Sequence, residues 1–126
     1  MKKVALFVFL IAFISCKKES EETFGQPNPT EVSQTPEELG KSIFEGKGNC
    51  AACHRMDEKL VGPSVKEIAK SYKVQNGDLV SFLKDEAKPI VDPSQYEMMK
   101  TNLALTKEMS DEELKGLEAY IYSQVK

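Results

Sequence analysis

Two cysteines three positions apart, Cys50 and Cys53, are followed directly by His54, which is the only histidine among the 126 residues. Two thiols at this spacing can add to the two vinyl groups of a porphyrin, and the adjacent imidazole can then ligate the iron. With its single histidine committed to iron, the chain cannot build a Ser-His-Asp triad, a paired-histidine zinc finger or a bis-histidine haem. The motif therefore predicts one covalently attached haem c.

Three other uses of a Cys-x-x-Cys pair have to be weighed against haem attachment. A thioredoxin-like redox pair needs a fold in which strands alternate with helices, and the sequence has no convincing strand pattern. A four-cysteine zinc site would have to use Cys16, the one cysteine outside the motif, which has a different explanation. A structural disulfide across so short a loop would be strained. The complete pentapeptide favours haem over these alternatives.

The N-terminus has the organisation of a secretory signal. Residues 1–3 form a short basic region, and residues 4–14 are an unbroken apolar run, which is too short to span a bilayer as a helix. The segment ending at Cys16 resembles a bacterial lipobox, in which the cysteine is lipidated, although Phe13 stands where leucine is usual. We expect residues 1–15 to be a signal peptide and Cys16 to carry a lipid anchor; a plain signal peptide with an incidental cysteine is the alternative.

The charge balance excludes one class of partner. The chain has a formal charge of −3, and without residues 1–15, which hold two lysines and no acidic residue, the charge is −5. An acidic chain is not expected to bind nucleic acid, which requires a basic surface. Residues 16–35 are rich in charged and small polar residues and have almost nothing to bury, so we expect a disordered tether there.

From residue 36 onward the pattern is helical, and we expect one haem domain over 36–126. Three helix starts are marked by capping boxes, each a Ser or Thr followed three positions later by Glu. These are Thr35 with Glu38, Ser64 with Glu67, and Ser110 with Glu113. The predicted helices lie near 36–46, 65–75, 78–86 and 110–125, with a long loop over 88–109. Because strand signals are absent, the predicted fold class is all-α, with about four short helices around one covalently attached haem.

This domain resembles a small bacterial class I cytochrome c with one haem. The resemblance rests on the haem motif and on two helices, the first with Gly40 and Phe44 on one face and the last with Leu117 and Tyr120. In this family a glycine and an aromatic residue of the first helix meet an aromatic and an aliphatic residue of the last. The resemblance therefore implies the cytochrome c fold and a close helix crossing that a side chain at Gly40 would obstruct.

A Gly-Pro pair follows the haem motif in the place where family members have a proline. The resemblance implies that the carbonyl of Pro63 accepts a hydrogen bond from the ring N–H of His54. Such a bond would orient the imidazole and raise its basicity. A simple turn before the next helix is the alternative role for this pair.

The second axial ligand must be methionine, lysine, another group or water, because the chain has no second histidine. A methionine thioether in that position raises the reduction potential relative to harder ligands. Met56 lies too near His54 to reach the opposite haem face, and Met109 directly precedes the last predicted helix, where it is more naturally a packing residue. Met98 and Met99, in the long predicted loop, remain as candidates.

We predict that Met99 ligates the iron, with Met98 as the alternative. Met99 lies 45 residues after His54, a spacing similar to that of short bacterial cytochromes c. The segment from Met99 to Asn102 also resembles the Met-x-x-Asn segment of the family, which implies that Asn102 hydrogen-bonds the ligand sulfur. Family members often have proline directly after the methionine, where this chain has Lys100.

These features predict a one-electron carrier in an extracytoplasmic respiratory chain, with iron held by His54 and Met99. Six-coordinate iron leaves no site for a substrate, so we do not expect an enzyme. The predicted location is the periplasm or cell envelope, with a lipid anchor at Cys16, and the predicted partners are membrane respiratory complexes or other redox proteins. Three alternatives stay open: a haem-based ligand-binding or peroxidase-like protein with an open distal site, a haem-free thiol module or structural lipoprotein, and a detachable subunit of a larger respiratory complex.

Overall fold

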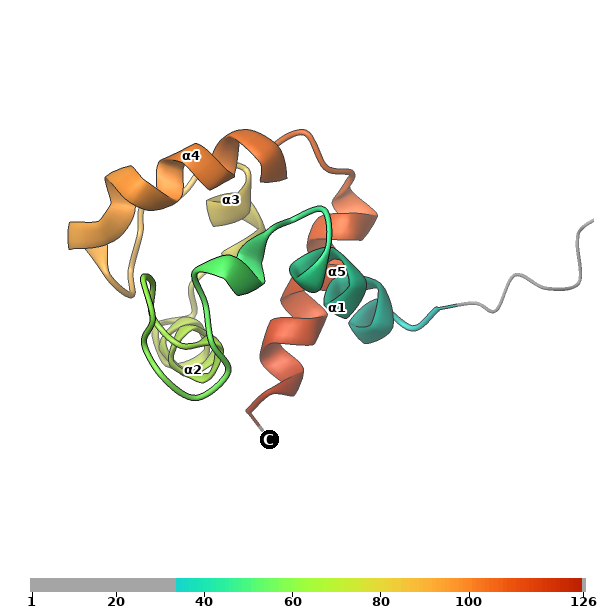
Figure 1. Ribbon diagram of the computed structural model, residues 1–126, viewed down its shortest axis with the longest axis horizontal. Helices are drawn as coiled ribbons and strands as arrows, with labels where there is room; N and C mark the ends of the chain where they lie inside the picture. Colours follow the sequence, from blue (N-terminus) through green and yellow to red (C-terminus); the bar gives the residue numbers. More distant parts are fainter. Residues whose placement is uncertain (1–33, 126) are drawn as a thin grey trace, which may run out of the picture. The chain divides into compact units, whose positions relative to one another are not determined.

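The computed structural model describes residues 34–125, and within this range it contains five α-helices and no β-strand. The helices are α1 (Pro36–Glu45), α2 (Val65–Gln75), α3 (Leu79–Leu83), α4 (Tyr96–Thr106) and α5 (Asp111–Ser123). In the view of Figure 1, α4 runs above the 3-10 turn Cys50–Ala52, and α2 lies below that turn. The all-α prediction is confirmed for this part of the chain. The predicted signal peptide, Cys16 and nearly all of the predicted tether lie outside the described residues.

The helix starts follow the predicted capping residues. The Thr35 hydroxyl accepts from the amide of Glu38, and the Glu38 carboxylate accepts from the amide of Thr35, so both halves of the capping box are present. The same reciprocal pair of bonds opens α5 at Ser110. At Ser64 the hydroxyl accepts from the amide of Glu67 over 3.1 Å, which caps α2 with the first of the two bonds. Local hydrogen bonding thus fixes where three of the helices begin.

The segment predicted as a long loop contains α4, so that prediction is wrong. The 3-10 turn Pro93–Gln95 leads directly into this helix. Gln95 makes no side-chain hydrogen bond as the N-cap, so the capping signal that marks the other helices is missing here. Only Leu103 and Thr106 of α4 are buried. The helix therefore lacks the continuous apolar face by which a surface helix is recognised in a sequence. Its Glu, Met, Lys, Leu and Ala residues are nevertheless good helix formers.

Helices α1 and α5 cross closely, as the resemblance implied. A Cβ atom added at Gly40 would lie 1.9 Å from the carbonyl oxygen of Gly116, so the two backbones touch at this point. Beside the contact, the rings of Phe44 and Tyr120 pack with their centroids 5.3 Å apart and their planes tilted by 56°. Gly116 was not among the residues singled out from the sequence, yet it forms the other half of the crossing.

The remaining helices pack around this pair. The buried apolar side chains of α1, α2, α3 and α5 form one core, which includes Ile43, Phe44, Val65, Ala69, Leu79, Leu83, Leu114 and Leu117. Helix α4 is fixed at its C-terminal end, where the buried hydroxyl of Thr106 donates to the carbonyl of Leu83 over 2.6 Å. No helix in the described range is long and apolar enough to cross a membrane.

Candidate haem site

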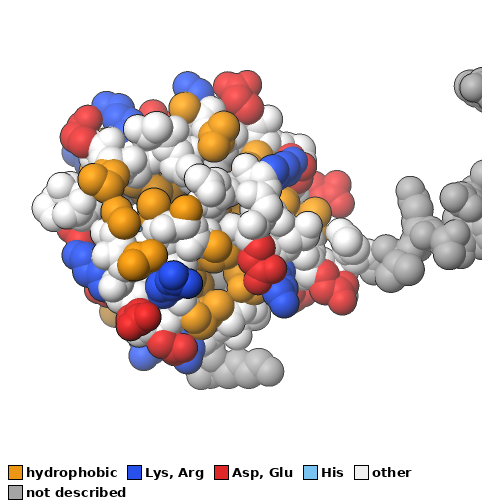
Figure 2. Space-filling view, in the orientation of Figure 1, with side chains coloured by type: hydrophobic (Ala, Val, Ile, Leu, Met, Phe, Trp, Pro, Cys, Tyr) orange, Lys and Arg blue, Asp and Glu red, His pale blue; other side chains and the backbone are white. Residues whose placement is uncertain are grey.

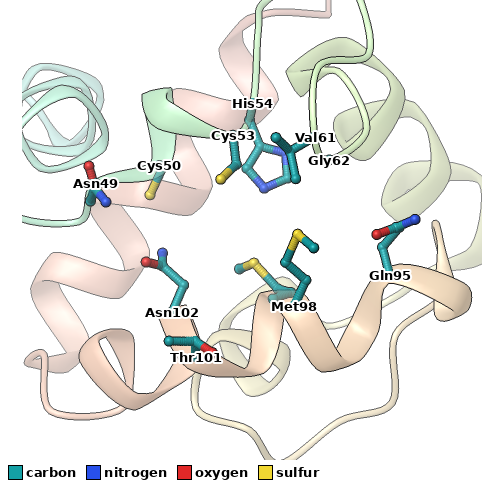
Figure 3. Close-up of a pocket in the computed structure, with 11 residues that line it drawn as sticks. Asn49, Cys50, Cys53, His54, Val61, Gly62, Gln95, Met98, Thr101 and Asn102 are labelled. Carbon is teal, nitrogen blue, oxygen red and sulfur yellow. The ribbon is translucent and has the colours of Figure 1, made fainter.

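A short turn brings the two thiols and the imidazole of the haem motif together. The amides of Cys53 and His54 both donate to the carbonyl of Cys50, at 3.1 and 3.0 Å, which closes one 3-10 turn. Asn49 precedes the turn with a φ of 50°, a left-handed conformation that asparagine adopts more readily than most residues. Figure 3 shows the side chains of Cys50, Cys53 and His54 on one side of a cavity. Both cysteines are free thiols.

The thiol of Cys50 is buried, whereas that of Cys53 is half-buried. Burial raises the pKa of Cys50 to about 11, because the thiolate would lose its hydration, and the neighbouring Cys53 adds to the shift. The protonated thiol donates a long hydrogen bond to the carbonyl of Gly48, with Sγ and O 3.4 Å apart. The same burial keeps the Cys50 thiol protonated until haem is attached.

The ring of His54 is oriented by the Gly-Pro pair. Its Nδ1 lies 2.8 Å from the carbonyl oxygen of Pro63. A carbonyl can only accept, so Nδ1 carries the proton, and Nε2 of the neutral ring keeps the lone pair that a metal needs. Gly62 packs against the same ring, because an added Cβ would lie 2.4 Å from Cε1 of His54. Sequence reasoning named Pro63 but did not assign a separate role to Gly62.

Two cavities lie beside this turn, of about 310 and 80 Å³. The first is enclosed by the haem motif on one side and by α4 on the other, where Figure 3 shows Met98 and Asn102 facing the motif. The second is lined mainly by apolar side chains, among them Phe44, Ile68, Tyr72, Leu79, Phe82, Leu83 and Ile121. Cys50, His54 and Met99 line both cavities. These three side chains therefore stand at the centre of one crevice.

The four methionines of the described range differ in their relation to the crevice. Met99 is partly buried, packs against the core and lines both cavities. Met98 lines the first cavity and is 59% exposed. Met56 and Met109 pack against the core and line neither cavity. The sequence-based candidates, Met98 and Met99, are thus the two methionines that reach the crevice.

Asn102 also lines the first cavity, one turn of α4 beyond Met99. Its side-chain Nδ2 donates to the carbonyl of Gly48 over 3.0 Å, across the cavity and next to the haem motif. The resemblance implied a bond from this amide to the ligand sulfur. Gly48 had no assigned role from the sequence, because nothing in the local pattern links it to a residue 54 positions later.

The chemistry of these groups fits a covalently bound haem. Two free thiols at the attachment spacing, an imidazole with an available Nε2 and a thioether on the facing helix are the donors that attachment and axial ligation require. The second cavity supplies an apolar wall for a porphyrin.

Comparisons with known proteins agree with this chemistry. A family model described as Cytochrome c matches residues 37–124. The cytochrome c-551 of Pseudomonas aeruginosa is 32% identical over 85 residues, which cover 65% of this chain and 73% of that protein. The cytochrome c-551 of Azotobacter vinelandii is 48% identical over 40 residues, covering 32% of this chain and 48% of that protein. The cytochrome c2 of Rubrivivax gelatinosus is 49% identical over 43 residues, covering 34% of this chain and 45% of that protein.

The extent of these matches differs among the relatives. The chain spans about half the length of the Azotobacter vinelandii protein and 57% of the cytochrome c-551 of Pseudomonas denitrificans. The family model, in contrast, covers more than two thirds of the present chain and includes the whole haem motif and α4. The chain therefore belongs to the cytochrome c family, and this membership implies one covalently bound haem c.

Proposed function

We propose that the protein is a one-electron carrier in which Cys50 and Cys53 hold one haem c, and His54 and Met99 ligate its iron. The observation that carries this proposal is that Cys50, His54 and Met99 line both cavities of one crevice. A thiol, an imidazole and a thioether converge there from two different segments of the chain. They are the groups that attachment and axial ligation of a c-type haem use.

Met99 is favoured over Met98 as the second ligand because of its burial. Met99 packs against the core, so its thioether is shielded from water on the protein side. Met98 is 59% exposed, and a ligand held there would compete with solvent. A shielded thioether favours ferrous iron and resists displacement by exogenous ligands.

The carrier function follows from what the chain does around the cofactor. When bound, the haem supplies an iron that alternates between ferrous and ferric states, which is the transfer of one electron. His54 and Met99 would hold the iron in both states, while the apolar wall that includes Phe44 and Leu79 would exclude water. With His54 and Met99 both on the iron, no position would be left for a substrate, so the proposed protein is not an enzyme.

The proposed location and partners follow from the sequence. The protein is exported to the periplasm or cell envelope and anchored by lipid at Cys16, and it exchanges electrons with membrane respiratory complexes or other redox proteins. On the face shown in Figure 2, acidic and basic side chains are interspersed, with apolar side chains between them. Docking on such a face would depend less on ionic strength than docking through a patch of one charge sign.

The first test is a visible absorption spectrum of protein made with haem-attachment machinery, oxidised and then reduced. A sharp haem c band on reduction and the weak far-red band of ferric iron bound to methionine sulfur are the expected results. A haem spectrum without the sulfur band would favour a ligand-binding protein with an open distal site. Protein without haem would contradict the proposal altogether.

Met99→Ala and Met98→Ala form a matched pair for the ligand assignment, because the two residues are neighbours on one helix and line the same cavity. Met99→Ala is expected to abolish the far-red band, lower the potential and let imidazole or carbon monoxide bind. Met98→Ala is expected to leave all three unchanged. The reverse pattern would move the ligand to Met98.

The anchor is tested separately from the haem. Wild-type protein is expected to take up labelled fatty acid and to fractionate with membranes, whereas Cys16→Ser should be unlabelled and appear in the soluble fraction. Equal fractionation of the two proteins, without labelling, would support a plain signal peptide instead.

A further inference from the structure

Helix α4, which carries the proposed ligand Met99, is tied to the rest of the described chain by side-chain hydrogen bonds near both ends. At its N-terminal end, Tyr96 Oη donates to Asp85 Oδ1 over 2.6 Å. At its C-terminal end, Thr106 Oγ1 donates to the carbonyl of Leu83 over 2.6 Å. Both partners lie in or just after α3. Neither bond has a partner in the haem-attachment segment.

A third bond crosses the crevice. Asn102 Nδ2 donates to the carbonyl of Gly48 over 3.0 Å; Gly48 is buried and Asn102 is half-buried. Figure 3 shows the Asn102 amide rising from α4 toward Asn49 and Cys50, on the opposite wall of the first cavity. The bond therefore joins the two walls, between positions 54 residues apart in the chain.

The acceptor of this bond is held firmly. The amide of Gly48 donates to the carbonyl of Ile43 in α1 over 2.8 Å, and the amide of Asn49 donates to the carbonyl of Gly46 over 2.9 Å. Gly48 is buried, and a Cβ atom there would lie 2.8 Å from the carbonyl oxygen of Ile43. The peptide that accepts from Asn102 is thus part of the α1 end of the core rather than a free loop.

Haem attachment would leave the Gly48 carbonyl with fewer side-chain hydrogen-bond donors. The Gly48 carbonyl also accepts from the Cys50 thiol, with Sγ 3.4 Å away. Attachment consumes that hydrogen: the sulfur bonds to one vinyl carbon, the hydrogen goes to the other carbon, and no electrons are gained or lost overall. The resulting thioether has no hydrogen to donate. Asn102 is then the side-chain donor left to this carbonyl.

We propose that Asn102 is a positioning residue that ties α4 to the haem-attachment segment and so sets the distance between Met99 and the opposite wall of the crevice. Asn102 lies one helical turn from Met99, so a displacement of one backbone is passed to the other. The inference rests on the proposed ligation of iron by Met99. It gives the amide a different partner, the Gly48 carbonyl, from the ligand sulfur implied by the family resemblance.

The test uses haem-loaded protein with Asn102→Leu, which keeps the approximate volume and removes the donor. Leu105→Ala is the control, because Leu105 is on the same helix, is 51% exposed and lines neither cavity. One readout is hydrogen exchange of the Gly48 and Asn49 amides; the other is the rate at which imidazole replaces methionine on ferric iron. Asn102→Leu is expected to raise both rates about fivefold to tenfold, the effect of losing one part-buried hydrogen bond. Leu105→Ala should change them by less than about twofold.

A second variant keeps the test decisive if Asn102→Leu does not load haem. Asn102→Ala removes the same donor, introduces no larger side chain and favours the helix. Faster exchange at Gly48 and Asn49 is again the expected result. Unchanged exchange in both variants would overturn the proposal.

The same substitution in a Met99→Leu background separates a tie to Gly48 from a bond to sulfur. The acceleration of amide exchange is expected to persist there, because the tie does not involve the thioether. An acceleration that disappears with the sulfur would overturn the proposal and assign Asn102 to the ligand. Failure of the proposed function has a different signature, since wild-type protein would then lack the far-red sulfur band while the exchange experiment still reports on the Gly48 contact.

Discussion

Replacing Gly40 by alanine sets two physical effects against each other at the crossing of α1 and α5. Alanine favours a helix over glycine by about 1 kcal/mol, so propensity alone predicts a more stable protein. The added methyl group, however, would lie 1.9 Å from the carbonyl oxygen of Gly116, 2.4 Å from its carbonyl carbon and 2.7 Å from Cβ of Tyr120. Two of these three atoms are backbone atoms, which cannot rotate away.

The steric effect is the larger one. Real Cβ atoms essentially never approach other heavy atoms closer than 3.0 Å, so the helices must separate by about 1 Å. Overpacking of this kind costs about 1–3 kcal/mol. The separation also disturbs the contact between Phe44 and Tyr120, and aromatic pairs contribute about 0.5–1.5 kcal/mol beyond their buried area. After subtracting the gain in propensity, we expect Gly40→Ala to lower the free energy of unfolding by about 2 kcal/mol.

The matched control is Gly116→Ala, on the facing helix of the same crossing. There the added Cβ would meet its nearest neighbours, Gly40 N, Leu39 Cγ and Pro36 O, at 3.2 Å, so small adjustments can accommodate it. Its effect should therefore be less than about 1 kcal/mol. Guanidinium unfolding of haem-loaded protein, followed by far-ultraviolet circular dichroism, measures both variants. A Gly40→Ala protein as stable as the wild type, or one less affected than Gly116→Ala, would refute the reasoning.

Three further predictions use the same unfolding assay. Gly62→Ala places a methyl group 2.4 Å from Cε1 of His54 and should cost about 1–3 kcal/mol. Thr106→Val removes the donor to the Leu83 carbonyl at a fully buried position and should also cost about 1–3 kcal/mol; no loss would mean that this bond contributes nothing. Burial raises the pKa of the Glu118 carboxyl, so ionisation of this group opposes folding. The free energy of unfolding therefore falls as the pH rises from the ordinary pKa of glutamate to the raised pKa of the folded protein. Glu118→Gln should thus raise the unfolding midpoint at about pH 7 and not at about pH 3.

The parts of the fold that could be predicted from sequence depend on local interactions. The starts of α1, α2 and α5 are each marked by a pair of residues three positions apart. The hydroxyls of Thr35, Ser64 and Ser110 accept the expected hydrogen bonds from backbone amides. Helix α4 has no such cap, and its residues divide between the crevice, the core and solvent. Its position is set by tertiary packing, which a pattern of local signals does not contain.

The haem site also combines local contacts, which could be predicted from sequence, with long-range contacts, which could not. The thiols and the imidazole come from five consecutive residues, so their common orientation follows from one turn of chain. The contact of His54 with the Pro63 carbonyl needed a family pattern to be anticipated. The bond from Asn102 to Gly48 could not be predicted, because the two residues are brought together by the folding of the segments between them. Gly116 was missed for a similar reason: a glycine in a helix signals a close approach without naming its partner.

The two walls of the crevice are therefore stabilised differently, one by short-range and the other by long-range contacts. On the attachment wall, the amide of His54 bonds the Cys50 carbonyl, and its ring bonds a carbonyl nine positions further on, so small loops are closed at little cost in chain entropy. The α4 wall depends on a bond that spans 54 positions and on packing that exists only when the rest of the domain is folded. In the proposed carrier, Cys50 and Met99 hold one cofactor from opposite walls. Cofactor binding then stabilises the placement of α4, and the order of α4 in turn determines how firmly Met99 stays on iron.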